Sequence, residues 1–442
     1  MSSPTDTRTE RTPRVVLVLA FLVLMLEGYD IIMYGTVVPS LLAHPEWGVT
    51  PDDAGHIGSL AVLGMAFGAI GAGLLNERVG RRRLLIGSVI LFSVAMAAAA
   101  VAAEPSHLGA FRFVVGLGAG ALLPTVVAMV IEYSPASRRG LNTAIAFAGV
   151  GVGGSAAGLL GTWIVPDHGW RPMFAIGALP ALVIVPLLWR SLPDSLPFLL
   201  ARGRDDEARR TADRLGVDLP TAIDGEARAG SSLAALRSLV SSRHLVSMAL
   251  FCVAIFFCLL VLFGANAWLP ALMIKAGYGV TSSLAFLLVL NIGATVGTLV
   301  AAPIADRIGF KPVTVVAFLA AAVSISLLAT QPSTAVVVVL VAAAGVGTTG
   351  TQILINAYIG SHYPAELRAT ALGLALGIGR VGGILGPTYG AMVIADLTPS
   401  WQFHAFAIPA AIGAAFTALV PRSRQDTAAG TEQDRSPESV AR

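Results

Sequence analysis

The feature that most constrains the fold is a series of long segments without charged residues. The segment from 84 to 103, LLIGSVILFSVAMAAAAVAA, carries no charge over twenty residues. A helix that rises 1.5 Å per residue needs about that length to cross ~30 Å of hydrocarbon. We therefore predict membrane-spanning helices, and expect twelve of them, over residues 15–39, 54–75, 84–103, 109–131, 141–165, 172–191, 245–270, 282–305, 312–330, 335–357, 369–394 and 402–420.

The composition agrees with a multi-pass membrane protein. Only 12% of the residues are charged and the mean hydropathy is +0.77, whereas a soluble domain carries roughly 25% charged residues. The first 14 residues are polar and the apolar run after them is longer than the core of a cleaved signal. We expect that run to remain as the first span.

One long polar stretch divides the chain into two parts of six spans each. Within it, ARGRDDEARRTADRLG is typical of a short amphipathic helix. The fold class that we predict is an all-α membrane protein, with twelve transmembrane helices in two six-helix halves. The domains that we expect are an N-terminal half over 1–190, a cytoplasmic linker over 191–243, a C-terminal half over 244–421 and a disordered cytoplasmic tail over 422–442.

The positive charges predict the orientation in the membrane. Of 29 Lys and Arg residues, 25 lie in the termini, the linker and the loops that follow even-numbered spans, and only Arg171 and Lys275 lie in loops on the other side. Positively charged loops stay cytoplasmic, so both termini should be cytoplasmic. The use of 27 Arg against 2 Lys suggests a GC-rich bacterial genome and hence a plasma (inner) membrane.

An internal repeat relates the two halves. Gly80 in GLLNERVGRRR matches Gly309 in the loop after the eighth span, and Arg139 matches Arg368, in both cases with an offset of 229 residues. Two motifs at one offset indicate a duplicated six-helix unit. Such parallel repeats are typical of secondary transporters, which bind their substrate near the middle of the membrane.

The chain resembles the major facilitator superfamily over nearly its whole length. The resemblance rests on GLLNERVGRRR with its echo ADRIGFK, and on RFVVGLGAG in the fourth span. Within that superfamily it resembles the aromatic acid:proton symporters, through EGYD in the first span, PTVVAMVIEYSP, PDSLPFLL and RATALGLALGIGRVGGILGP. Glu27 replaces the first Asp of the family's D-G-x-D motif. The resemblance implies proton-coupled import of a small aromatic carboxylate by alternating access.

Two carboxylates in the first span, Glu27 and Asp30, are candidates for carrying the proton. They are three residues apart, so they lie on one helix face, and Gly28 leaves room there for a close partner or a ligand. An acid in the membrane interior costs ~2.5 to 3.5 kcal/mol on insertion scales and is usually functional. The alternative is that one or both simply pair with Arg112 or line a polar helix contact.

Two arginines inside spans complete the predicted substrate and proton site. Arg380 lies mid-way along the eleventh span, and its planar guanidinium could bind a substrate carboxylate with two hydrogen bonds. A structural ion pair with Glu27 or Asp30 is the alternative. Arg112 lies near the outer end of the fourth span and could instead extend to the membrane surface.

Further candidates lie near the ends of spans. Tyr29, Glu132 and Arg368 are secondary candidates, of which Glu132 and Arg368 match residues used by the resembled family, although loop gating or solvation explains both equally well. The repeated order acid-Arg-x-Gly indicates gating loops that hold the cytoplasmic side shut, through tight turns, helix caps and ion pairs. The alternative is a solvated positively charged loop, which explains the arginines but not the repeated order. The residues assigned to these loops are Gly73, Glu77, Arg78, Gly80, Arg81, Asp306, Arg307 and Gly309.

Other function classes find little support in the sequence. A proton-driven drug or sugar transporter shares the fold but would not require Arg380. A membrane-embedded enzyme or sensor would need a nucleophile and base or a cluster of histidines, whereas the seven His residues lie in loops or near span ends. The glycine-rich GVGVGGSAAGLLG is predicted to be a close-packing surface rather than a phosphate-binding loop. We therefore expect no catalytic residues, metal, cofactor, nucleic acid or obligate protein partner.

Overall fold

The computed structural model describes residues 14–134, 138–215, 237–239 and 244–421. The expected tail over 422–442 lies outside the described residues, as do 216–236 and 240–243 of the expected linker.

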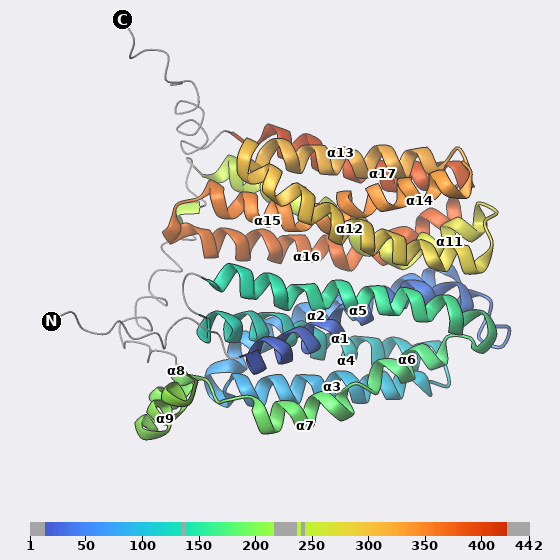
Figure 1. Cartoon of the computed structure of the whole chain (residues 1–442). Coiled ribbons are helices and arrows are strands. Elements are labelled where there is room, and N and C mark those ends of the chain that lie inside the picture. Colours follow the sequence, from blue (N-terminus) through green and yellow to red (C-terminus); the bar gives the residue numbers. More distant parts are fainter. Residues whose placement is uncertain (1–13, 135–137, 216–236, 240–243, 422–442) are drawn as a thin grey trace, which may run out of the picture. The chain divides into compact units, whose positions relative to one another are not determined.

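The described residues form helices joined by short loops (Figure 1). Within the described ranges, twelve segments are long and apolar enough to cross a membrane, as the sequence predicts. The helices are α1 (Arg14–Leu42), α2 (Pro51–Val79), α3 (Arg81–Ala100), α4 (Pro105–Glu132), α5 (Arg139–His168), α6 (Arg171–Ala178), α7 (Ala181–Ser191), α8 (Leu196–Ala201), α9 (Asp205–Leu215), α11 (Leu245–Lys275), α12 (Val280–Ile308), α13 (Phe310–Leu328), α14 (Thr334–Gly345), η3 (Val346–Gly350), α15 (Thr351–His362), α16 (Ala365–Asp396) and α17 (Pro399–Leu419).

Two spans that the sequence predicts as single helices are interrupted. The sixth consists of α6 and α7, and the break falls beside Pro180, which has no N–H to donate to the preceding turn. The tenth consists of α14 and α15 joined by a π-helical turn, η3. Charge and hydropathy do not register such breaks, because the residues on both sides are equally apolar.

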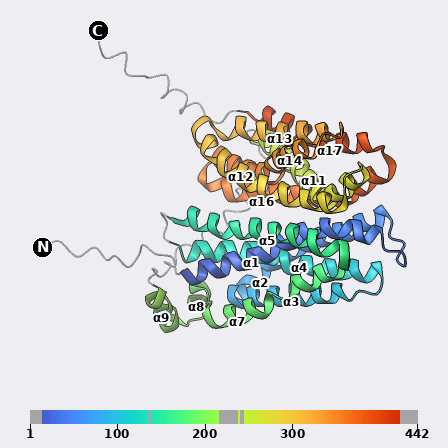
Figure 2. The ribbon, with the colours of Figure 1, turned by 45° about the vertical axis from the view of Figure 1, so that its right-hand side comes forward.

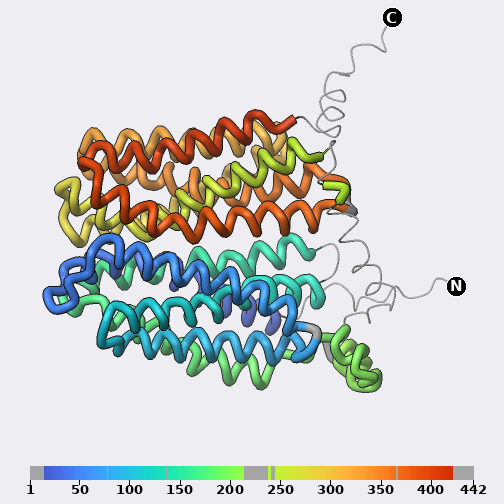
Figure 3. The backbone as a smooth tube through the Cα atoms, turned by 180° about the vertical axis from the view of Figure 1, so that it is seen from behind, coloured from blue at the N-terminus to red at the C-terminus, as the bar shows by residue number. Residues whose placement is uncertain are grey.

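Contacts divide the chain into two compact units. Of the described residues, unit 1 contains those within Met1–Asp224, Phe263–Asn291 and Pro387–Leu397, and unit 2 contains the others. Unit 1 thus includes the end of α11, the beginning of α12 and the end of α16. Within it, the loop between α1 and α2 lies at one end of the bundle and α8 and α9 lie at the other (Figures 1 and 3).

Glycines bring the helices of unit 1 into backbone contact in two pairs. On α1 and α5, a Cβ at Gly28 would overlap the carbonyl of Val150, and one at Gly153 would overlap that of Met25. On α2 and α4, a Cβ at Gly120 would overlap the carbonyl of Met65. The close-packing surface expected in the glycine-rich part of α5 is therefore confirmed. The partner for which Gly28 leaves room is α5.

Unit 2 packs by the same means. Helices α13 and α17 lie side by side (Figures 1 and 2), and Gly413 of α17 makes room for the ring of Phe318. Cys252 and Cys258 are buried free thiols, and Cys258 donates to the carbonyl of Thr348 at 3.8 Å. Their buried positions agree with the packing role expected from their spacing.

Candidate functional site

A buried ion pair joins two helices in the interior of unit 1. Asp30 of α1 accepts a hydrogen bond from Nη1 of Arg112 of α4. Asp30 is 2% exposed and Arg112 is 3% exposed, so the Arg112 side chain does not extend to the membrane surface. We call Asp30 and Arg112 the interior pair. In apolar surroundings their charges attract each other far more strongly than they would in water.

The ring of Tyr34 lies against the guanidinium of the interior pair. The Cζ atom of Arg112 is 4.8 Å from the centre of the ring, a distance typical of a cation–π contact. The hydroxyl of Tyr34 donates to the carbonyl of Ala54 at the start of α2. Nε of Arg112 is buried and has no hydrogen-bond partner among the described residues. Asp30 and the face of the Tyr34 ring therefore stabilise the guanidinium together.

A small cavity adjoins the interior pair. It has room for about one or two water molecules, and its lining includes Asp30, Tyr34, Met65, Arg112, Phe263 and Pro387, all of unit 1. The cavity is too small for an aromatic ring. It could hold a water that exchanges a proton with Asp30.

The other candidates in the first span have different surroundings. Glu27 is 4% exposed and lies one turn before Asp30 on α1. Tyr29 donates its hydroxyl to the carbonyl of Met173 of α6 at 2.7 Å, and its ring lies beside Gly177. Tyr29 therefore contacts α6, whereas Tyr34, one turn after Asp30, contacts Arg112.

Arg380 belongs to unit 2 and lies in α16, where it is partly buried. Gly379 and Gly382 beside it have no space for a Cβ, because Ile255 and the carbonyl of Phe256 of α11 lie there. The small neighbours of Arg380 therefore serve helix packing, and its role in substrate binding stays a prediction.

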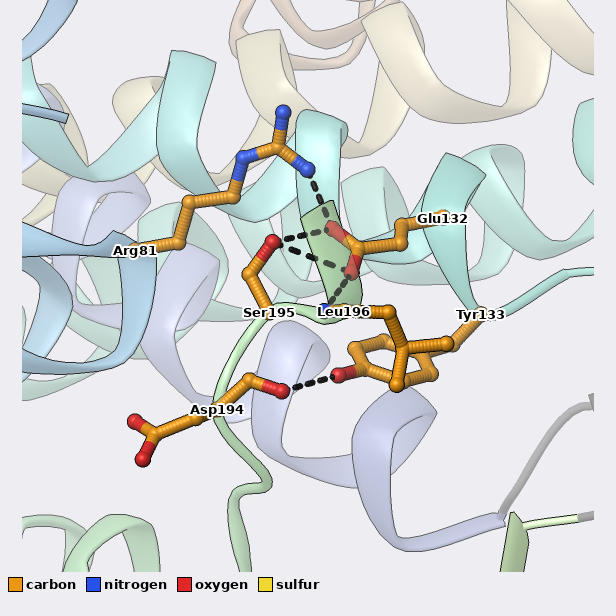
Figure 4. A network of polar contacts seen from close by, with 6 residues as sticks. All are labelled: Arg81, Glu132, Tyr133, Asp194, Ser195 and Leu196. Carbon is orange, nitrogen blue, oxygen red and sulfur yellow. Dashed lines mark hydrogen bonds and ion pairs between the residues drawn. The ribbon is translucent and has the colours of Figure 1, made fainter. Parts of the chain in front are cut away.

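A second ion pair lies at the opposite end of α4, in a dense group of hydrogen bonds (Figure 4). Glu132 accepts a hydrogen bond from Arg81 of α3. It also accepts from Oγ of Ser195, which lies 3.0 Å from Oε1 and 2.9 Å from Oε2 of Glu132. It also accepts from the backbone N–H of Leu196 at 2.6 Å. We call Arg81, Glu132, Ser195 and Leu196 the end network. Its bonds tie α3, α4 and the start of α8 together, so Glu132 is not simply solvated.

Two weaker links lie beside the end network. The hydroxyl of Tyr133 donates to the carbonyl of Asp194 at 2.8 Å (Figure 4). The carboxylate of Asp194 lies 3.8 Å from Arg82, and both side chains are partly exposed.

The glycines of the two gating-loop motifs have similar backbone conformations. Gly80 between α2 and α3 has φ of 87°, and Gly309 between α12 and α13 has φ of 96°, a region that side chains disfavour. Gly73 differs from the expectation of a tight turn, because it lies inside α2 with open space around it.

The remaining gating-loop candidates make few interactions. Arg78, Asp306 and Arg307 are exposed, and Arg202 donates to the carbonyl of Arg78 at 2.7 Å. The side chain of Glu77 lies outside the described residues. Arg368 is exposed and its Nε donates to the carbonyl of Tyr363 at 2.9 Å.

The sequence reasoning missed two groups of residues around these sites. Tyr34 follows Asp30 by four residues, which places both on one face of α1, and that spacing could have identified it. Ser195 and Leu196 lie in PDSLPFLL, but the sequence gives no sign that Glu132 of α4 is their partner. That contact depends on tertiary structure.

Comparison with known proteins agrees with the fold. The family model described as Major Facilitator Superfamily matches residues 20–297 and 287–442. The benzoate transport protein of Acinetobacter baylyi is 33% identical, over 90% of this chain and 87% of that protein. The gentisate transporter of Corynebacterium glutamicum is 38% identical, over 84% and 78%.

Solved structures support the fold at lower sequence identity. The crystal structure of the D-xylose-proton symporter superposes with a TM-score of 0.73 at 18% identity, covering 94% of this chain and 99% of that one. At this identity the likeness concerns the fold alone.

Proposed function

Because the chain belongs to the Major Facilitator Superfamily of transporters, we propose that it imports a small aromatic carboxylate together with protons, by alternating access. The observation that carries the proton coupling is the buried Asp30–Arg112 pair. The substrate class follows from the relatives, which are named as transporters of benzoate, gentisate and 4-hydroxybenzoate.

The interior pair suits a proton switch because its strength depends on the charge of Asp30. An ionised Asp30 holds the guanidinium of Arg112 by charge and by a hydrogen bond, and therefore holds α1 to α4. A proton on Asp30 removes the charge attraction and so weakens the link between α1 and α4. Glu27, one turn away, is a second candidate for the proton.

Transport by purified protein in proteoliposomes tests the coupling. Labelled benzoate, 4-hydroxybenzoate and gentisate, with xylose as a neutral solute, are offered with and without an imposed proton gradient. We expect accumulation of an aromatic acid only with the gradient. Asp30→Asn should abolish accumulation but retain exchange of substrate across the membrane, since exchange needs no proton cycle. The coupling is wrong if Asp30→Asn and Glu27→Gln both accumulate substrate like the wild type.

We also propose that Arg380 binds the carboxylate of the substrate. Loss of one partner of a desolvated charge pair costs ~2 to 5 kcal/mol, which corresponds to at least about tenfold weaker binding. The expected order of affinity is wild type, then Arg380→Lys, which keeps the charge without the planar fork, then Arg380→Ala. Competition by the amide of the same acid should change little across the series. Equal losses for the acid and the amide would assign Arg380 to the fold.

From the charges of the loops we propose that both termini and the linker lie in the cytoplasm. Single cysteines at Ser2, Arg204 and Ser423 should resist an impermeant thiol reagent added to intact cells. Strong labelling at these positions would reverse the orientation.

A further inference from the structure

We infer that Tyr34 is a positioning residue of the proton switch, whose ring holds the Arg112 guanidinium against Asp30. This inference rests on the proposed function, because it assigns a role to a residue beside the proposed proton site.

The first observation is the way in which Arg112 is surrounded. Its side chain is almost fully buried, and its partners among the described residues are the carboxylate of Asp30 and the ring of Tyr34. Its Nε, which could have bound a carbonyl, has no hydrogen-bond partner in the same part of the chain. An arginine held by so few groups depends strongly on each of them, because a buried cation gains little from the apolar atoms around it.

The second observation is that Tyr34 itself is fixed from two sides. Its hydroxyl donates to the carbonyl of Ala54, which anchors the far end of the ring to α2. The edge of the ring lies over Gly58, where a Cβ would stand 2.8 Å from Cε1 of Tyr34. The ring is therefore a rigid support, with a fixed place for the guanidinium on its face.

The third observation concerns what lies behind the ring. The same position at Gly58 is 2.9 Å from Cβ of Pro387, and the next residue on α2, Ser59, bonds to Thr388 at 2.7 Å. All of these residues belong to unit 1. Tyr34 thus links the interior pair to the contact between α2 and the end of α16. If Arg112 shifts after proton binding, the ring of Tyr34 would transmit that shift to the contact between α2 and the end of α16.

The charged groups that line the cavity beside the ring are Asp30 and Arg112, and Glu27 lies one turn before Asp30 on α1. If the ring is removed, Arg112 is held less firmly and the carboxylate of Asp30 loses part of its partner. Asp30 then stays protonated to higher pH. Because a desolvated cation–π contact is worth ~2 kcal/mol, the decline of uptake at alkaline pH should move upward by roughly half a pH unit or more.

The test compares variants that keep or remove the ring. Tyr34→Phe keeps the face of the ring and loses the bond to Ala54, whereas Tyr34→Met fills similar space without a ring. Thr36→Val is the matched control, because it removes a buried hydroxyl of the same helix that bonds to Met33 of its own helix. Each protein is assayed in proteoliposomes for the pH profile of uptake, for accumulation driven by a proton gradient and for substrate exchange.

We expect Tyr34→Met to show the alkaline shift and about tenfold less accumulation, with exchange retained. The pH profile of Thr36→Val should match the wild type, and that of Tyr34→Phe should lie nearer to the wild type than to Tyr34→Met, because the face of the ring is kept. If Tyr34→Met has the wild-type pH profile, or if Tyr34→Phe shifts as far as Tyr34→Met, the inference is wrong. Equal loss of exchange and accumulation without a shift would assign Tyr34 to the fold. Should Tyr34→Met not purify as a monodisperse protein, Tyr34→Leu serves in its place under the same criteria.

Asp30→Asn, measured beside these variants, separates this inference from the proposed function. If Asp30→Asn loses accumulation while Tyr34→Met behaves like the wild type, only the role of Tyr34 is rejected. If Asp30→Asn accumulates substrate normally, the proton switch and the role of Tyr34 are both rejected.

Discussion

Two acid–arginine pairs occupy opposite ends of α4, and their surroundings differ in kind. Arg112 of the interior pair and Glu132 of the end network are twenty residues apart, which is about 30 Å along a helix. Glu132 accepts hydrogen bonds from a guanidinium, a hydroxyl and a backbone N–H. Asp30 is bound by Arg112 alone among the hydrogen bonds described above.

The difference supports the interior pair, and not the end network, as the proposed proton switch. In the end network, the neutral donors of Ser195 and Leu196 would still bind Glu132 if Arg81 moved away. In the interior pair, one proton on Asp30 removes most of what holds Arg112. We therefore propose that the number of neutral partners separates an ion pair that holds helices together, as in the end network, from the proposed proton switch of the interior pair.

The largest effect that would break this comparison is expected from Arg112→Met. It leaves a buried carboxylate without its cation, and breaking a buried pair in this way costs ~3 to 5 kcal/mol. We expect a lower thermal unfolding temperature in detergent and no accumulation of substrate in proteoliposomes.

The double variant Asp30→Asn with Arg112→Met separates stability from function. The double variant leaves no uncompensated buried charge, and a neutral amide costs far less to bury than a carboxylate, so the unfolding temperature should recover toward the wild type. Accumulation should not recover. If accumulation returned together with stability, the interior pair would have only a structural role, like the end network.

An intermediate effect is expected from Glu132→Gln. A hydrogen bond to a charged group contributes ~1.5 to 3 kcal/mol, and the amide keeps one acceptor oxygen for Ser195 or Leu196 while losing the charge that faces Arg81. We expect a lower maximal rate and lower stability, measured by initial uptake and by thermal unfolding. The pH profile should match the wild type, and a shifted profile would place Glu132 in the proton pathway.

The smallest effect is expected from Asp194→Asn. Its carboxylate lies 3.8 Å from a partly exposed Arg82, and such pairs contribute ~0 to 1 kcal/mol. The bond from Tyr133 uses the backbone carbonyl of Asp194, which the substitution keeps. Stability and initial uptake should stay near the wild type. A loss as large as that of Glu132→Gln would extend the end network to Asp194.

The sequence predicts the spans well because each is a property of its own segment. Burial of Asp30 also follows from its segment, since it lies in an apolar run with few other charges. For Arg112 the sequence left open an extension to the membrane surface, which its burial excludes. The pairing of these two residues was only one of several alternatives, because which helices are neighbours depends on packing at glycines such as Gly28 and Gly120. The break at Pro180 has a local cause, the missing N–H of proline, which charge and hydropathy do not register. The partner of Glu132 depends on tertiary contacts that no local pattern carries.

The glycine positions at the backbone contacts tolerate far less substitution during evolution than the side chains that join the helix pairs. Within the α1–α5 and α2–α4 pairs, even a methyl group would collide with the main chain. Between the pairs, the joins described above are side chains: Asp30 to Arg112, and Tyr34 to Ala54. A lineage can therefore retune how firmly the two pairs hold together by exchanging a few side chains, while the pairs themselves stay unchanged. If the interior pair is the proton switch that we propose, the rate and pH range of transport can diverge among descendants that share one fold.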